Sequence, residues 1–134
     1  MRVEEAPLSA DQRRRAWVIT AGLLTGSVVI LAAALFVRRL IVPTGPAIVS
    51  WLAVAFAVLS PGVAALFGRT GARGSQPGVN PGEAALIRHL RTSALLEGAA
   101  IFCAVALVAG PEVWPLVAAA VPITALVVRL PRAA

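Results

Sequence analysis

Four apolar runs divide the chain, and each is bounded by arginine, proline or glycine. They cover residues 16–37, 47–67, 92–110 and 113–128. The first run, at about 1.5 Å per residue, is roughly 33 Å long, which suffices to cross a hydrocarbon core of about 30 Å. The pattern predicts an all-α integral membrane bundle of four antiparallel transmembrane helices. These helices form one domain at residues 16–132, preceded by a polar tail at 1–15.

Helix starts and interruptions can be placed from local signals. Ser9 and Asn80 are candidate N-caps, the second followed by proline at the first helical position. Pro61 interrupts the second run, so we expect a kink there and a carbonyl near Ala57 that lacks its usual donor. Pro122 predicts a similar kink in the fourth run.

Residues 68–91 form the longest polar connection. We expect a loop that leads into an interfacial helix, because apolar residues alternate with Arg88, His89 and Arg91 near its end. This segment either lies along the headgroup layer or rises through it into the third span.

The first run could instead belong to a signal peptide, with residues 13–15 as its basic region. The run is longer than the usual apolar region of a signal peptide and ends on Arg38 and Arg39. We therefore favour a retained transmembrane helix.

Composition supports a membrane protein, because 59% of the residues are hydrophobic and only 13% are charged. All twelve basic residues are arginines, and the formal net charge is +6. They cluster at the ends of apolar runs, which favours headgroup contacts over nucleic-acid binding. Arginine without lysine, together with abundant Ala, Gly, Val and Pro, fits a GC-rich bacterial genome.

The arginines also predict the topology. Ten of the twelve lie in the tail, in the 68–91 connection with its helical extension, or after residue 128, and only Arg38 and Arg39 lie on the other side. The positive-inside rule then places both termini in the cytoplasm. Five residues are predicted interfacial anchors: Trp17, Trp51, Trp114, Arg88 and Arg91.

Small residues at four-residue spacing predict close helix packing. Gly22 and Gly26 form a GxxxG pattern, and Ala94 and Gly98 form a similar pair on the third run. We favour packing within the chain over a homodimer face.

Glu97 is the one acidic residue inside an apolar run of membrane length. An ionisable residue there costs about 2.5–3.5 kcal/mol even on lenient insertion scales. Counted from Thr92, it lies about 8 Å deep. At comparable depth, the sequence predicts an intramembrane polar layer around Glu97 that also contains Ser93, Ser60, Thr25 and Thr124.

Three roles for Glu97 follow. In the first, the carboxyl is protonated or bonded to a neighbouring hydroxyl and ties helices together. In the second, it forms an ion pair with Arg88, Arg91 or His89, or with an arginine of another chain. In the third, it loads and releases a proton or cation, or contacts a ligand headgroup. No enzyme chemistry is expected, because His89 is the sole histidine and no second carboxylate is near Glu97 in sequence. We predict neither a metal site nor a cofactor.

The segment from Leu95 to Phe102 resembles the carboxylate-bearing helix of the rotary ATP synthase c subunit. That resemblance implies proton or sodium translocation at Glu97. It covers about one helix, and the glycine ladder of that family is missing from the preceding helix.

Nearly the whole chain resembles a group of small bacterial four-helix inner-membrane proteins of uncharacterised function. The shared features are an arginine-flanked first span, a polar loop and an arginine-rich approach (86–91) to the motif at Ala94–Gly98. This resemblance implies a fold and a location. We expect a non-enzymatic structural or accessory subunit that binds other membrane proteins or itself. The alternative is an oligomeric proton- or ion-handling protein that uses Glu97.

Overall fold

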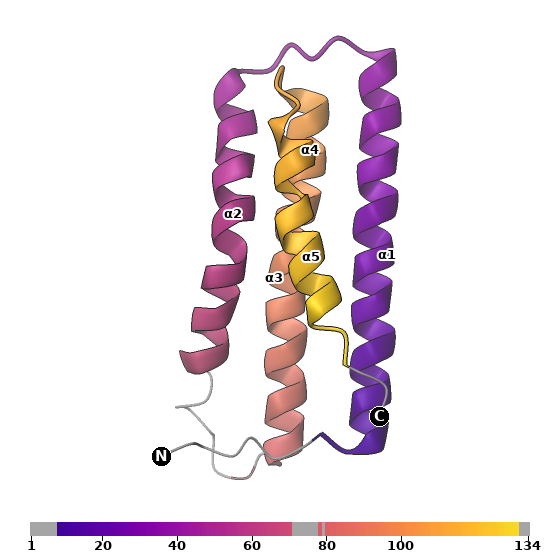
Figure 1. Ribbon diagram of the computed structural model, residues 1–134, viewed down its shortest axis with the longest axis vertical. Coiled ribbons are helices and arrows are strands. Elements are labelled where there is room, and N and C mark those ends of the chain that lie inside the picture. Colours follow the sequence, from indigo (N-terminus) through magenta and orange to yellow (C-terminus); the bar gives the residue numbers. More distant parts are fainter. Residues whose placement is uncertain (1–7, 71–77, 79, 132–134) are drawn as a thin grey trace.

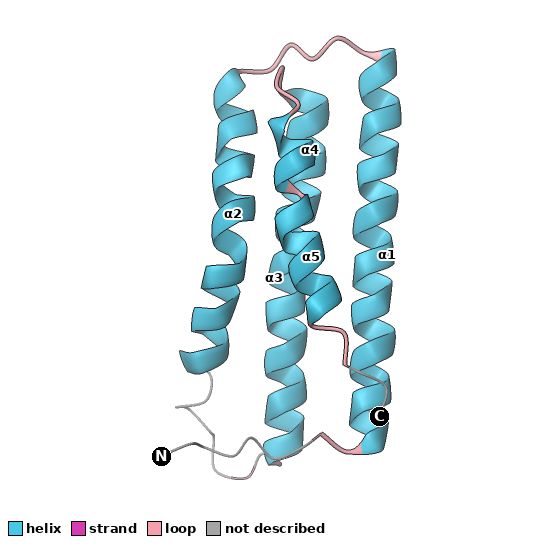
Figure 2. Cartoon of the chain, in the orientation of Figure 1, coloured by secondary structure: helices cyan, strands magenta, loops and turns pink. Residues whose placement is uncertain are grey.

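A computed structural model describes residues 8–70, 78 and 80–131, and this part of the chain contains helices and no strand (Figures 1 and 2). The helices are α1 (Ala10–Leu40), α2 (Ala47–Thr70), α3 (Pro81–Ala109), α4 (Trp114–Ala118) and α5 (Ala120–Val128). The all-α prediction is confirmed, and α1, α2 and α3 are long and apolar enough to cross a membrane. Parts of the predicted tail and loop, and the residues after 131, lie outside the described residues.

Both predicted N-caps are confirmed. The backbone N–H of Gln12 donates to the Ser9 hydroxyl at 3.2 Å, and the Ser9 N–H donates back to the Gln12 side chain at 3.1 Å. The Asn80 side chain accepts from the N–H of Gly82 at 3.1 Å. As a result, α1 begins before its apolar run, and α3 begins eleven residues before Thr92 as one uninterrupted helix.

The centre of the fold is α3. It packs extensively against α1 and α2, whereas α1 and α2 hardly contact each other although they are consecutive. In the most apolar 18-residue stretch of each helix, half of the α3 residues are buried, compared with 22% of the α1 residues and 28% of the α2 residues. Alanines supply much of the buried α3 surface, for example Ala99, Ala100 and Ala104, and their small side chains let the helices approach closely.

Residues of α1 lie beside residues of α3 that are about 70 positions later in the chain, and this offset, the register of the two helices, is nearly constant along them. From one end to the other, the facing pairs are Gln12 with Gly82, Thr20 with His89, Gly26 with Glu97, and Arg38 with Gly110. The two helices therefore run side by side in the same direction along their whole length.

This register sets the level of Glu97 relative to α1. Its partner in register, Gly26, lies about 15 Å inside the apolar run that begins at Ala16. The sequence estimate of about 8 Å was counted from Thr92, because the polar residues before it were expected at the level of the headgroups. Instead, His89 already lies beside Thr20 of the first apolar run.

The prolines have the expected effects on the backbone. In α2, Pro61 cannot donate to the Ala57 carbonyl, and the Ser60 hydroxyl donates to that carbonyl instead, at 2.8 Å. The fourth apolar run is helical from Trp114 to Val128 with one interruption: α4 ends at Ala118 and α5 begins at Ala120, two residues before Pro122, while Ala119 between them keeps helical backbone angles.

Candidate functional site along the central helix

The Glu97 carboxyl lies against the backbone of α1. A Cβ atom built on Gly26 would be 3.7 Å from the Glu97 Oε1. The Glu97 side chain is partly exposed. In the described part of the chain it makes no hydrogen bond and no ion pair. A carboxyl group thus lies at mid-length of the apolar helices, at the edge of the α1–α3 interface, without an internal partner.

The hydroxyls of the predicted polar layer make no hydrogen bond to Glu97 among the described residues. The Ser60 hydroxyl bonds the Ala57 carbonyl, and the exposed Thr25 hydroxyl bonds the Ala21 carbonyl of its own helix at 2.8 Å. Thr124 is exposed in a shallow groove on the outer face of α5. Ser93, one turn before Glu97, is fully buried, and its hydroxyl has no hydrogen-bond partner among the described residues.

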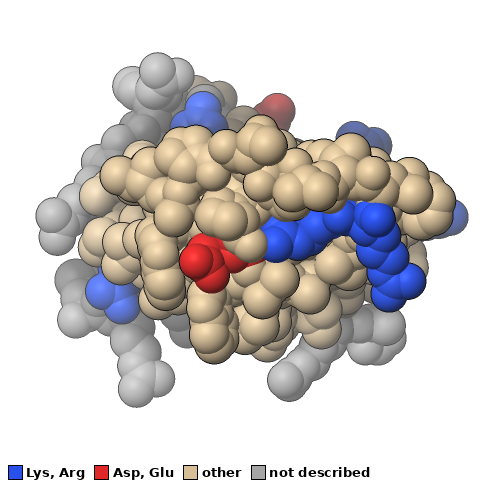
Figure 3. Space-filling view, turned by 90° about the horizontal axis from the view of Figure 1, so that it is seen from above, with Lys and Arg blue, Asp and Glu red and all other residues tan. Residues whose placement is uncertain are grey.

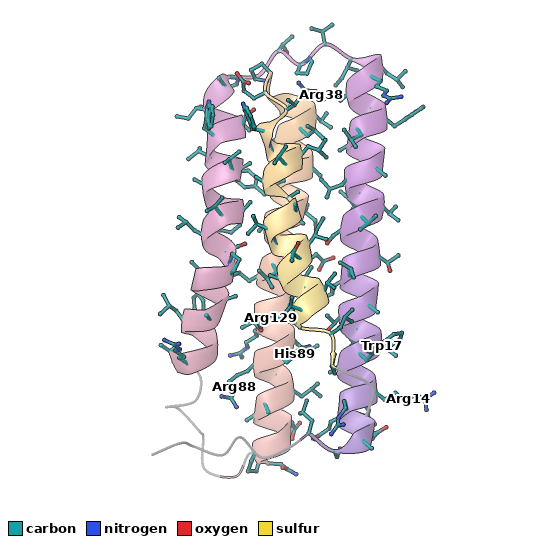
Figure 4. The ribbon with its side chains drawn as sticks, in the orientation of Figure 1. Arg14, Trp17, Arg38, Arg88, His89 and Arg129 are labelled. Atoms are coloured by element: carbon teal, nitrogen blue, oxygen red, sulfur yellow. The ribbon has the colours of Figure 1, made fainter. Side chains whose placement is uncertain are left out.

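Other polar side chains do meet, nearer the N-terminal end of α3. The Thr20 hydroxyl of α1 and the His89 Nε2 are 2.9 Å apart. The Arg129 guanidinium, at the end of α5, donates to the Thr92 hydroxyl, which donates in turn to backbone carbonyls of α3. Figure 4 shows His89 and Arg129 at a similar height in the bundle. We call these four residues, Thr20, His89, Thr92 and Arg129, the His89 cluster.

The His89 cluster joins three helices in a largely buried place. Thr20 is fully buried and Thr92 is 3% exposed. Partial burial lowers the pKa of the Arg129 guanidinium from its ordinary value, although arginine stays charged at neutral pH. The cluster therefore holds a positive charge, and its bonds tie α1 and α5 to α3.

Sequence reasoning missed this cluster. His89 was expected as an interfacial residue or as an ion-pair partner of Glu97, and no contact between His89 and Thr20 or between Thr92 and Arg129 was predicted. The bonded pairs are 69 and 37 residues apart. No local motif links them, so only the register between the helices could have brought them together.

A second polar joint lies at the opposite end of the bundle. The Arg38 guanidinium donates to the carbonyls of Leu107, Gly110 (2.9 Å) and Pro111 (2.6 Å), and the N–H of Gly45 donates to the Ala109 carbonyl at 2.9 Å. The last carbonyls of a helix have no partner inside it, so Arg38 and Gly45 cap α3 from outside. Seen from this end, basic and acidic side chains lie next to each other across the helix ends (Figure 3).

Gly45 is required at that joint. A Cβ atom there would lie 2.3 Å from the Ala109 carbonyl oxygen, closer than any real contact. The turn between α1 and α2 therefore reaches α3 only because residue 45 has no side chain.

The predicted packing residues separate into two groups. Gly26 faces α3, whereas Gly22, Ala94 and Gly98 are exposed, and neither Gly22 nor Gly98 has an atom of another helix within 4 Å of a Cβ built on it. The small residues are therefore not all used for packing inside the chain. Those left exposed are Gly22 on α1 and Ala94 and Gly98 on α3, the last two within one turn of Glu97 in sequence.

The predicted anchors lie at both ends of the bundle. Trp17, Trp51 and Trp114 are each about half exposed: 49%, 53% and 53%. Trp17 is near the start of α1, while the other two lie near the starts of α2 and α4, at the opposite end. Arg88 is partly buried and Arg91 is exposed.

Within the described ranges, no three His, Cys, Asp or Glu side chains lie close enough together to hold a metal ion. Comparisons with protein families, with curated proteins and with solved structures found no match to this chain.

Proposed function

We propose that this chain is a non-enzymatic, multi-pass membrane protein that acts as a structural or accessory subunit of a larger membrane assembly. The observation that carries the proposal is the Glu97 carboxyl, which lies at mid-length of apolar helices without a partner in the described chain. A carboxyl in that position is costly, about 2.5–3.5 kcal/mol on lenient scales. A hydrogen bond from a neighbouring transmembrane helix offsets part of that cost.

The surface beside Glu97 suits such a neighbour. Gly22, Ala94 and Gly98 are exposed and small, so another helix can approach closely, and interhelical contacts in lipid depend on such close packing. Hydrogen bonds between membrane helices contribute about 0.6–1.7 kcal/mol. In this proposal the partner helix carries a donor at the depth of Glu97.

The arginine distribution supports a defined orientation in a bacterial inner membrane. In the proposed topology the start of α1, the start of α3 and the end of α5 face the cytoplasm, where the positive-inside rule places arginine-rich segments. The Arg38 joint then faces the other side. The resemblance to small four-helix bacterial membrane proteins agrees with this arrangement.

The test is the mass and composition of the native particle. We expect the chain, extracted from its own membrane in mild detergent, to travel in a defined particle larger than the monomer. Glu97→Gln should stay in that particle because the amide still hydrogen-bonds, whereas Glu97→Leu should leave it. Glu83→Leu, in the exposed first turn of α3, is the control for loss of an acidic residue. A particle of monomer mass for the unchanged chain would contradict the proposal.

A second candidate, proton or ion handling, is favoured by the mid-length position of Glu97. Within one chain, however, the α1–α3 interface from Glu97 to Arg38 is lined by apolar residues such as Leu31, Ala104 and Leu107. An ion path would therefore need an oligomer. Flux in proteoliposomes distinguishes the two functions: Glu97→Gln would abolish flux in a translocator while leaving the particle mass unchanged.

A further inference from the structure

An open groove runs between α1 and α3 at their N-terminal ends. Its volume is about 520 Å³, and its lining residues are Asp11, Arg14, Arg15, Val18, Ile19 and Leu86. The groove is separate from the His89 cluster and from Glu97. It is not explained by the proposed subunit role.

The lining is divided by depth. The three charged residues precede Ala16, where the first apolar run begins, and the apolar ones follow it on α1. From Arg15 to Ile19 is one helical turn, about 6 Å along the axis. The charged part thus lies at the level where headgroups meet hydrocarbon, and the apolar part lies within the hydrocarbon.

The charged part carries a net positive charge. Asp11 and Arg15 form an ion pair at 2.9 Å, and both side chains are largely exposed. Arg14 is exposed and forms no ion pair among the described residues (Figure 4). One guanidinium therefore remains without a neutralising carboxylate beside an apolar wall.

We propose that this groove binds an anionic phospholipid. The phosphate lies beside Arg14 and Arg15, and an acyl chain lies along Val18, Ile19 and Leu86. Guanidinium groups bind phosphate through paired N–H donors, and juxtamembrane arginines attract anionic lipids. A transmembrane helix suits this site less well, because branched side chains line it and the small residues begin a turn deeper, at Gly22.

The test is lipid binding to the purified full-length chain, measured by native mass spectrometry. Phosphatidylglycerol is compared with phosphatidylcholine of identical acyl chains. We expect phosphatidylglycerol to bind more tightly, and Arg14→Gln to weaken its binding roughly fivefold, the effect of about 1 kcal/mol per arginine. Arg69→Gln removes the same charge at the same end of the bundle but outside the groove, and should leave binding unchanged.

A second variant is expected to tighten lipid binding, which a damaged fold would not do. Asp11→Asn removes the carboxylate that neutralises Arg15 and should tighten phosphatidylglycerol binding, while Glu83→Gln, the same change outside the groove, should not. Equal binding of the two lipids would overturn the proposal. Equal weakening of lipid binding by Arg14→Gln and Arg69→Gln would also overturn it, because that result indicates a general charge effect. Displacement of the lipid by inorganic phosphate would overturn it as well, because that result indicates a simple anion site.

Discussion

Replacing Arg38 by alanine removes the cap at the end of α3. In the structure, one guanidinium donates to the carbonyls of Leu107, Gly110 and Pro111. These oxygens have no donor within the helix, and the positive charge also lies at the negative end of the helix dipole. Arg38→Ala should therefore loosen the contact between α1 and α3 at this end.

The size of the effect follows from the exposure of each bond. The bonds to Leu107 and Gly110 are part-buried, and each contributes about 1–1.5 kcal/mol. The bond to Pro111 is exposed, so water replaces it at little cost. Together with about 0.5 kcal/mol from the helix dipole, the expected loss of stability is roughly 2.5–3.5 kcal/mol.

The adjacent Arg39 provides a matched control. It carries the same charge one residue later, is exposed and makes no side-chain hydrogen bond or ion pair with the described residues. Arg39→Ala should change the free energy of unfolding by less than about 0.5 kcal/mol. The measurement is denaturant unfolding in detergent micelles followed by far-ultraviolet circular dichroism. Equal stability of the two variants would refute the capping role of Arg38.

Two further predictions concern the same joints. Gly45→Ala should destabilise the protein by more than about 1 kcal/mol, because a Cβ atom overlaps the Ala109 carbonyl oxygen, and a variant as stable as the parent in thermal unfolding would contradict this contact. Thr20→Val should lower the free energy of unfolding by about 1–2 kcal/mol, because it leaves the His89 ring nitrogen unpaired. A double-mutant cycle with His89→Ala should give a coupling energy above about 0.5 kcal/mol. Additive effects of the two substitutions would show that the bond contributes nothing to stability.

Much of the helical architecture could be predicted because its signals are local. Apolar runs of membrane length define the long helices, and caps such as Ser9 and Asn80 define their starts. The missing backbone N–H of Pro61 is also a local feature, so the sequence predicts that the Ala57 carbonyl loses its helical donor. The sequence did not predict that the Ser60 hydroxyl replaces that donor. Pro122 likewise marks the irregularity of the fourth helix, whose regular hydrogen bonding is interrupted at Ala119.

The contacts of the candidate site could not be predicted, because they depend on which helices adjoin and in what register. The level of Glu97 relative to α1 was not predictable, because arginine and histidine before Thr92 resemble a headgroup segment in sequence. In the structure, the His89 side chain hydrogen-bonds the Thr20 hydroxyl, and α3 is continuous on both sides of His89. The bonds of Arg38 likewise join residues about 70 positions apart.

The central position of α3 has a consequence for biosynthesis. The first two helices leave the ribosome as a hairpin whose members hardly contact each other, and their shared partner is still unmade. At about 5–20 residues per second, the roughly 40 residues between Thr70 and Gly110 take about 2–8 s to synthesise. During that interval the nascent hairpin is held by lipid and the insertion machinery alone. Chains that stop before α3 should therefore be substrates for membrane proteases.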